Sequence, residues 1–102
     1  MNVEFIYDSK ESRYCGLECY SAYDLTNQEY MYDARGSKIS VALNREKKIL
    51  FFFGMDSKGD YILDKMFYFK LIKQYLRDNE EIAKEYTICP HTVGGEIYFK
   101  YN

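Results

Sequence analysis

The sequence predicts one α+β domain, in which an antiparallel sheet of four to five strands packs against one long amphipathic helix. Three observations predict this class. Short segments that alternate apolar and polar residues lie before residue 54 and after residue 95, as expected for strands. Turn-forming residues separate these segments. An apolar stripe with helical spacing occupies residues 68–86. The length of 102 residues suits one core, so residues 1–102 form a single predicted domain.

The first half of the chain supplies most of the predicted strands. Residues 2–7 alternate as NVEFIY and form the first strand. Residues 8–28 show no clear period, so we predict a loop there with one helical turn at most. Residues 29–35 and 38–44 then form two strands joined by a turn at Gly36 and Ser37.

The segment KILFFFG, residues 48–54, predicts a central strand. Ile49, Phe51 and Phe53 occupy one face of this strand. Leu50 and Phe52 occupy the other face, so both faces require cover. The sequence DSKGD at 56–60 is typical of a turn. A closing strand is expected at residues 96–101, EIYFKY.

The long helix follows from apolar residues that recur at intervals of three and four. They are Tyr68, Leu71, Ile72, Tyr75, Leu76, Ile82, Ala83 and Tyr86. Asp64 is a candidate N-cap, and the helix is expected to end before Pro90. We expect the stripe to pack on Phe51 or Phe53. Asn79 leaves open a division into two shorter helices.

The composition indicates a cytoplasmic protein. The first residues lack a basic region followed by an apolar core, so no secretory signal is predicted. The longest apolar run, Ile49–Met55, is far shorter than the ~20 residues that span a bilayer. Three cysteines are an odd number, which favours a reducing compartment over a disulfide framework.

Cysteine and histidine offer the main alternative function, a small metal- or thiol-dependent enzyme. Its residues would be Cys15, Cys19, Cys89 and His91. The Cys-x3-Cys spacing departs from the Cys-x2-Cys of common zinc knuckles and redox dithiols. Buried, inert thiols explain the pattern more simply. We therefore predict no metal, no cofactor and no catalytic residue, and expect a protein that is not an enzyme.

A nucleic-acid-binding module is the second alternative. Lys70, Lys73 and Arg77 form a basic stripe on the helix face opposite the apolar one, together with Gln74. Such a stripe is usually a solvated surface, and the net charge of −2 does not indicate a dedicated nucleic-acid binder. Direct nucleic-acid binding is therefore not our preferred interpretation.

Tyrosine and acidic residues concentrate between residues 14 and 33. Residues 1–34 hold seven acids and two bases, whereas residues 35–102 hold nine acids and twelve bases. Five of the twelve tyrosines lie between residues 14 and 33. Tyrosine is enriched at protein interfaces, and carboxylates steer basic partners. The predicted partner-binding residues are Tyr14, Glu18, Tyr20, Tyr23, Asp24, Glu29, Tyr30, Tyr32 and Asp33. Core positions for about half of these tyrosines remain an equally open interpretation.

The sequence thus predicts a small inhibitor that binds a protein with a basic surface. Its richness in Lys, Ile, Asn, Tyr and Phe is typical of AT-rich bacterial or phage genomes. The expected role is that of a phage or mobile-element protein that blocks a nucleic-acid-processing enzyme of host defence. Such a role is anti-CRISPR-like or resembles that of an immunity protein.

Overall fold

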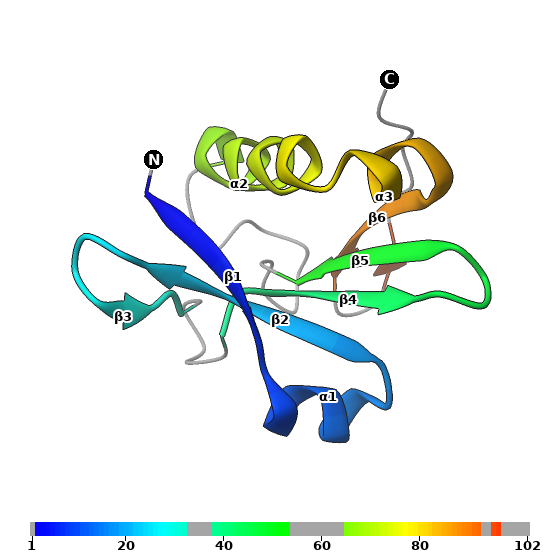
Figure 1. Cartoon of the computed structure of the whole chain (residues 1–102), viewed down its shortest axis with the longest axis horizontal. Helices are drawn as coiled ribbons and strands as arrows, with labels where there is room; N and C mark the ends of the chain where they lie inside the picture. Colours follow the sequence, from blue (N-terminus) through cyan, green and yellow to red (C-terminus); the bar gives the residue numbers. More distant parts are fainter. Residues whose placement is uncertain (1, 33–37, 54–64, 93–94, 97–102) are drawn as a thin grey trace.

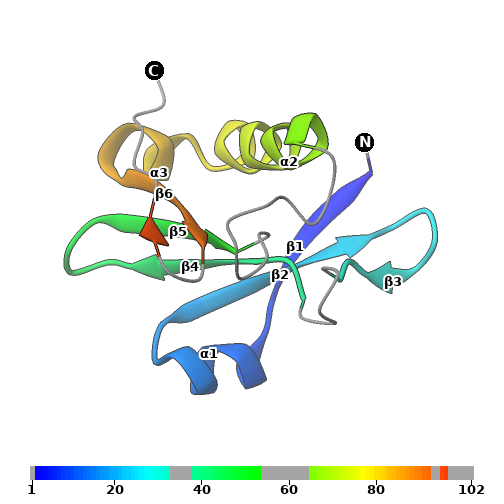
Figure 2. The same cartoon turned by 180° about the vertical axis from the view of Figure 1, so that it is seen from behind.

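The computed structural model describes residues 2–32, 38–53, 65–92 and 95–96, and they form an α+β fold (Figure 1). Helices α2 (Lys65–Asp78) and α3 (Glu80–Glu85) lie on one face of a sheet, and α1 (Ser9–Cys15) lies on its other side. Figure 2 shows the same arrangement from behind. The strands are β1 (Val3–Tyr7), β2 (Glu18–Asp24), β3 (Glu29–Tyr30), β4 (Ser40–Asn44), β5 (Ile49–Phe53), β6 (Thr87–Thr92) and β7 (Gly95–Glu96). The helices are α1 (Ser9–Cys15), α2 (Lys65–Asp78) and α3 (Glu80–Glu85).

The sheet is mixed, so the prediction of a purely antiparallel sheet was wrong. Its strand order is β1-β2-β4-β5-β6-β7. Strand β3 lies off this path and pairs with Tyr23 and Asp24 of β2, whereas β4 pairs with residues 18–21 of the same strand. Strands β5 and β6 run parallel, with Leu50 opposite Ile88. Parallel neighbours need a crossover connection, and here the connection contains α2 and α3.

Residues 8–28 were predicted as a loop, but they contain α1 and the central strand β2. The side chain of Asp8 caps α1 by accepting a 3.0 Å hydrogen bond from the backbone N–H of Glu11. Gly16 ends the helix at φ 74°, a left-handed conformation that glycine adopts without strain. Asp followed three residues later by Glu is a helix-start signal, so the sequence contained evidence for α1.

The single long helix that we predicted is two shorter helices, divided at Asn79. The side-chain amide of Asn79 donates a 2.8 Å hydrogen bond to the carbonyl of Tyr75. The backbone of Asn79, at φ −135° and ψ 62°, leaves the helical conformation. The chain then begins α3, which ends at Glu85 with Tyr86 as its C-cap, close to the expected boundary. Asparagine competes with helical hydrogen bonding in this way, which explains the break.

The core lies between these helices and the sheet. Leu71, Ile72 and Leu76 are fully buried, as the stripe predicted. They face the side of the sheet that carries Phe52, so the expected packing on Phe51 or Phe53 was wrong. Phe52 and Tyr75 meet edge to face with ring centroids 5.6 Å apart. Alternation along β5 directs Phe51 and Phe53 to the opposite face, where both are half-buried.

Several predicted features lie outside the described residues. They are the turns at 36–37 and 56–60, the cap Asp64 and residues 97–101 of the closing strand, while for Tyr68 only the backbone is described. Within the described ranges, no helix has both the length and the apolar character that crossing a membrane requires.

Candidate protein-binding surface

The β2–β3 hairpin brings together most of the predicted partner-binding residues. We call the set Tyr23, Asp24, Glu29, Tyr30 and Tyr32 the hairpin surface. In the strand register Tyr23 lies opposite Tyr30, and Asp24 lies opposite Glu29. The two tyrosine rings meet edge to face, with centroids 5.0 Å apart. Cross-strand aromatic pairs stabilise a hairpin and hold its rings in place.

Asp24 shapes the turn that joins β2 to β3. Its Oδ1 accepts hydrogen bonds from the backbone N–H groups of Thr26, at 2.9 Å, and Asn27, at 3.3 Å. Its Oδ2 accepts a 2.8 Å bond from the side-chain amide of Asn27. These bonds, led by that from the Asn27 side chain, lower the pKa of Asp24. Asp24 therefore combines a structural role in the turn with a permanent negative charge near neutral pH.

A shallow depression of about 280 Å³ opens beside the hairpin. It is lined by Asp24, Glu29, Tyr30, Met31 and Tyr32. Glu29 is exposed, and Tyr32 is 52% exposed. Among the described residues that line the depression there are two carboxylates and no base. This composition suits a positively charged side chain with an apolar stem, such as lysine or arginine.

Lys38 contacts the hairpin surface through the ring of Tyr30. Its ammonium nitrogen lies 4.3 Å from the centroid of the Tyr30 ring. It also lies 2.9 Å from Oδ2 of Asp8, which is 7% exposed. Ser21 donates a further 2.9 Å bond to the same oxygen. Because Asp8 neutralises Lys38, the cation adds little positive charge to the neighbouring depression.

The pKa of Asp8 reflects this network. Burial raises it, but hydrogen bonds from Lys38, Glu11 and Ser21 together outweigh burial and lower the pKa to about 2. The hydrogen bond to Asp8 raises the pKa of Lys38 in turn. Neither Asp8 nor Lys38 is among the predicted site residues, and the two lie 30 residues apart. Their pairing depends on tertiary structure.

Glu18 and Tyr20 lie apart from the hairpin surface toward the other end of β2, although both share a strand face with Asp24. Side chains of a strand alternate between faces, so Tyr20 points toward the helices and Tyr23 points away. Tyr20 donates a hydrogen bond to Glu18, and Glu18 pairs with Arg45 at 2.7 Å. Arg45, followed by Tyr20, lowers the pKa of Glu18 to about 2. This acid is already paired within the chain.

The remaining two predicted residues fall elsewhere. Tyr14 is 90% exposed on α1, in a separate depression lined by Lys10, Glu11 and Arg13 as well. Asp33 lies outside the described residues. The eight predicted residues that the structure describes are therefore divided among the hairpin surface, the Glu18–Tyr20 part of β2 and α1.

No protein-family model, no curated protein and no solved structure matches this chain.

Cys89 lies far from the other two cysteines of the enzyme alternative. Cys19, Ala42, Phe51 and Cys89 lie in register across four neighbouring strands. Three strand spacings separate the first from the last, which is about 14 Å. The described residues contain no group of three or more His, Cys, Asp and Glu side chains arranged to hold a metal. A site that joins Cys15 and Cys19 to Cys89 would need a different strand order.

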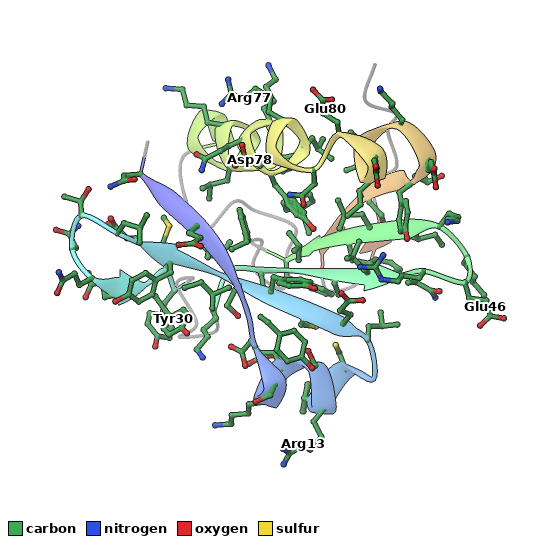
Figure 3. All side chains as sticks on the ribbon, viewed as in Figure 1. Arg13, Tyr30, Glu46, Arg77, Asp78 and Glu80 are labelled. Atoms are coloured by element: carbon green, nitrogen blue, oxygen red, sulfur yellow. The ribbon has the colours of Figure 1, made fainter. Side chains whose placement is uncertain are left out.

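The basic helix stripe lies on another part of the molecule. Lys70, Lys73 and Arg77 are exposed on α2. Gln74 is half-buried and donates a hydrogen bond to the carbonyl of Val3, so it does not belong to the solvated stripe. In Figure 3, Arg77 projects from the outer side of the helices and Tyr30 lies at the hairpin, well away from it. The acids Asp78 and Glu80 follow directly along the chain and interrupt the basic character of this face.

Proposed function

We propose that this protein binds another protein through the hairpin surface and inhibits it by occupying a basic site. One observation supports the proposal above the others. The depression beside the hairpin is lined by two acidic residues and two tyrosines, with no base among its described lining residues. Tyrosine provides contact area at low conformational cost, and acids increase the association rate with basic partners.

The mode of recognition follows from this geometry. A lysine or arginine of the partner enters the depression, where its stem contacts Tyr30 and Tyr32. Its charged group then meets Asp24 and Glu29. The Tyr23–Tyr30 ring pair and the Asp24 turn hold these groups before the partner arrives. Such preorganisation lowers the entropic cost of association.

The type of target follows from charge. Enzymes that process nucleic acids carry basic grooves that neutralise phosphates. An acidic surface that competes for such a groove would exclude the nucleic acid. We therefore keep a nucleic-acid-processing enzyme of host defence as the proposed target, and phage or mobile elements as the proposed source.

The test compares two charge variants of the full chain. One is Asp24→Asn with Glu29→Gln, which removes both charges and keeps an oxygen acceptor at the turn. The other is Lys70→Gln with Lys73→Gln on α2, a control that also neutralises two charges. Each tagged variant is used to capture proteins from a lysate of the native host, and mass spectrometry identifies them.

We expect the unmodified chain to capture a basic protein. The variant changed at Lys70 and Lys73 (the helix variant) should still capture it, and the variant changed at Asp24 and Glu29 (the hairpin variant) should not. Binding of that protein should also weaken as salt rises. If the helix variant alone loses its partner, and if that partner is nucleic acid or depends on it, the hairpin proposal is wrong. The basic stripe of α2 would then be the functional surface.

A further inference from the structure

Two thiols lie side by side where α1 meets β2. The Sγ atoms of Cys15 and Cys19 are 2.8 Å apart. Cys15 is the last residue of α1 and is exposed, whereas Cys19 is the second residue of β2 and only 2% exposed. A disulfide bond is about 2.05 Å long, so the sulfur atoms need to approach by only about 0.8 Å.

Backbone and side-chain contacts hold both thiols in this position. The N–H of Cys19 donates a 2.8 Å hydrogen bond to Oγ of Ser12, which belongs to α1. The carbonyl of Cys19 accepts a 2.9 Å bond from the N–H of Asp8. Gly16, at φ 74°, turns the chain sharply between the two elements. The dithiol is therefore built into the junction of α1 and β2.

We propose that Cys15 and Cys19 form a redox-active dithiol, which a low-molecular-weight disulfide of the glutathione class oxidises to an intramolecular disulfide. In the first step the Cys15 thiolate attacks one sulfur of the reagent. The reagent's S–S bond breaks, one thiolate leaves and takes up a proton, and a mixed disulfide remains on Cys15. In the second step Cys19 loses its proton to solvent and attacks Sγ of Cys15, which expels the second thiolate. Two protein thiols are oxidised and one reagent disulfide is reduced to two thiols.

Accessibility assigns the two roles. Cys15 is open to solvent, so a small reagent reaches it without any rearrangement of the fold. Cys19 is buried, so it reacts with the mixed disulfide on Cys15 and not with the reagent in solution. Burial raises the pKa of Cys19 to about 12, and the neighbouring Cys15, Glu11 and Asp8 act in the same direction. Burial of Cys19 therefore holds back the second step, because only the thiolate attacks.

Peptide mapping of the oxidised full chain tests the pairing. The folded protein is incubated with oxidised glutathione, alkylated after denaturation and cut after basic residues and after glutamate. Cleavage at Arg13, Glu18 and Glu29 separates residues 14–18 from residues 19–29. The proposal expects these peptides to be joined and to separate on reduction, with Cys89 alkylated as the internal control. Unlinked peptides, or a link to Cys89, would overturn it.

Two variants test the order of the steps. Cys19→Ser should stop at the mixed disulfide and retain glutathione on Cys15. Cys15→Ser, a change at an exposed position, should acquire glutathione on Cys19 at least tenfold more slowly. Equal modification of the two variants would contradict the assignment of Cys15 as the attacking thiol. The map of the unmodified sequence decides the pairing even if Cys19→Ser folds poorly.

Discussion

The ammonium group of Lys38 lies 2.9 Å from Oδ2 of Asp8 and 4.3 Å from the ring centre of Tyr30. One side chain therefore connects the N-cap of α1 to the hairpin surface. Asp8 is almost fully buried, and its two oxygens accept three hydrogen bonds, from Glu11, Ser21 and Lys38. A paired, buried carboxylate of this kind makes the stability of the fold depend on pH.

Acid should weaken the fold through Asp8. The folded-state pKa of about 2 lies below the usual 3.8, so the contribution of the carboxylate is present above about pH 4. This contribution to the free energy of unfolding is lost as the pH falls from about 4 through about 2. The lost contribution amounts to about 2 kcal/mol. Urea unfolding followed across this pH range measures it.

Asp8→Asn is the comparison for that measurement, since the amide can still accept at the N-cap but does not titrate. Its loss of stability in acid should be smaller by about the same 2 kcal/mol. Some acid dependence will remain, because the pKa of Glu18 is lowered as well. Identical pH profiles for the two proteins would show that Asp8 does not carry the effect.

Leu76→Ala should destabilise the protein by about 2–5 kcal/mol, the usual cost of a cavity at a fully buried leucine. Leu76 is 0% exposed and packs in the cluster that contains Phe52. Urea unfolding gives the free energy, and Lys73→Ala on the exposed side of the same helix is the control. A loss below about 0.5 kcal/mol for Leu76→Ala would mean that this helix face is not in the core.

Tyr30→Ala should accelerate dissociation of the captured partner roughly thirtyfold, corresponding to an interface anchor of about 2 kcal/mol. The ring pairs with Tyr23 and lines the depression, so its removal affects both contact area and preorganisation. Tyr23→Ala tests the second ring of the pair. Surface plasmon resonance supplies the rates.

Tyr14→Ala is the matched control for Tyr30→Ala, because Tyr14 is exposed on α1 and outside the hairpin surface. Its dissociation rate should equal that of the unmodified chain. An effect at Tyr14 as large as that at Tyr30 would move the binding surface toward α1. Circular dichroism of each variant confirms that the fold is retained.

Zinc should be present at far below one equivalent in the purified protein, and EDTA should leave the melting temperature unchanged. The reason is geometric, since about 14 Å of sheet separates Cys19 from Cys89. Elemental analysis and thermal unfolding with and without EDTA make the two measurements. Stoichiometric zinc would show that the thiols converge in solution and would restore the metal-dependent alternative.

Local pattern was sufficient to predict β1, β5 and the buried face of α2. In β5, apolar residues on both faces correctly indicated a central strand. The pattern failed at β2. Cys19, Ser21 and Ala22 are all buried there, but a serine and a cysteine do not mark a strand as apolar. Ser21 is tolerated there because Asp8 accepts its hydrogen bond, and that contact is not visible in a local window.

The candidate site was predictable as a region but not as a surface. Composition located the tyrosines and acids, and the hairpin collects five of the nine. It could not separate Tyr20 from Tyr23, because that distinction requires knowing that both lie in one strand. The ion pair of Lys38 with Asp8 could not be predicted either, because the two residues lie 30 positions apart and their contact depends on how α1 packs on the sheet.

The parallel pairing of β5 with β6 has a consequence for how the chain folds. Ile49 pairs with Thr87, 38 positions later, whereas β4 and β5 are joined by a tight turn. Closing a longer loop costs more entropy, and non-local pairing slows folding. We therefore expect the hairpins of residues 3–53 to form early and β6 to join last. Until residues 87–92 have left the ribosome, one edge of β5 lacks its native neighbour, and the nascent chain is most prone to aggregate in that interval.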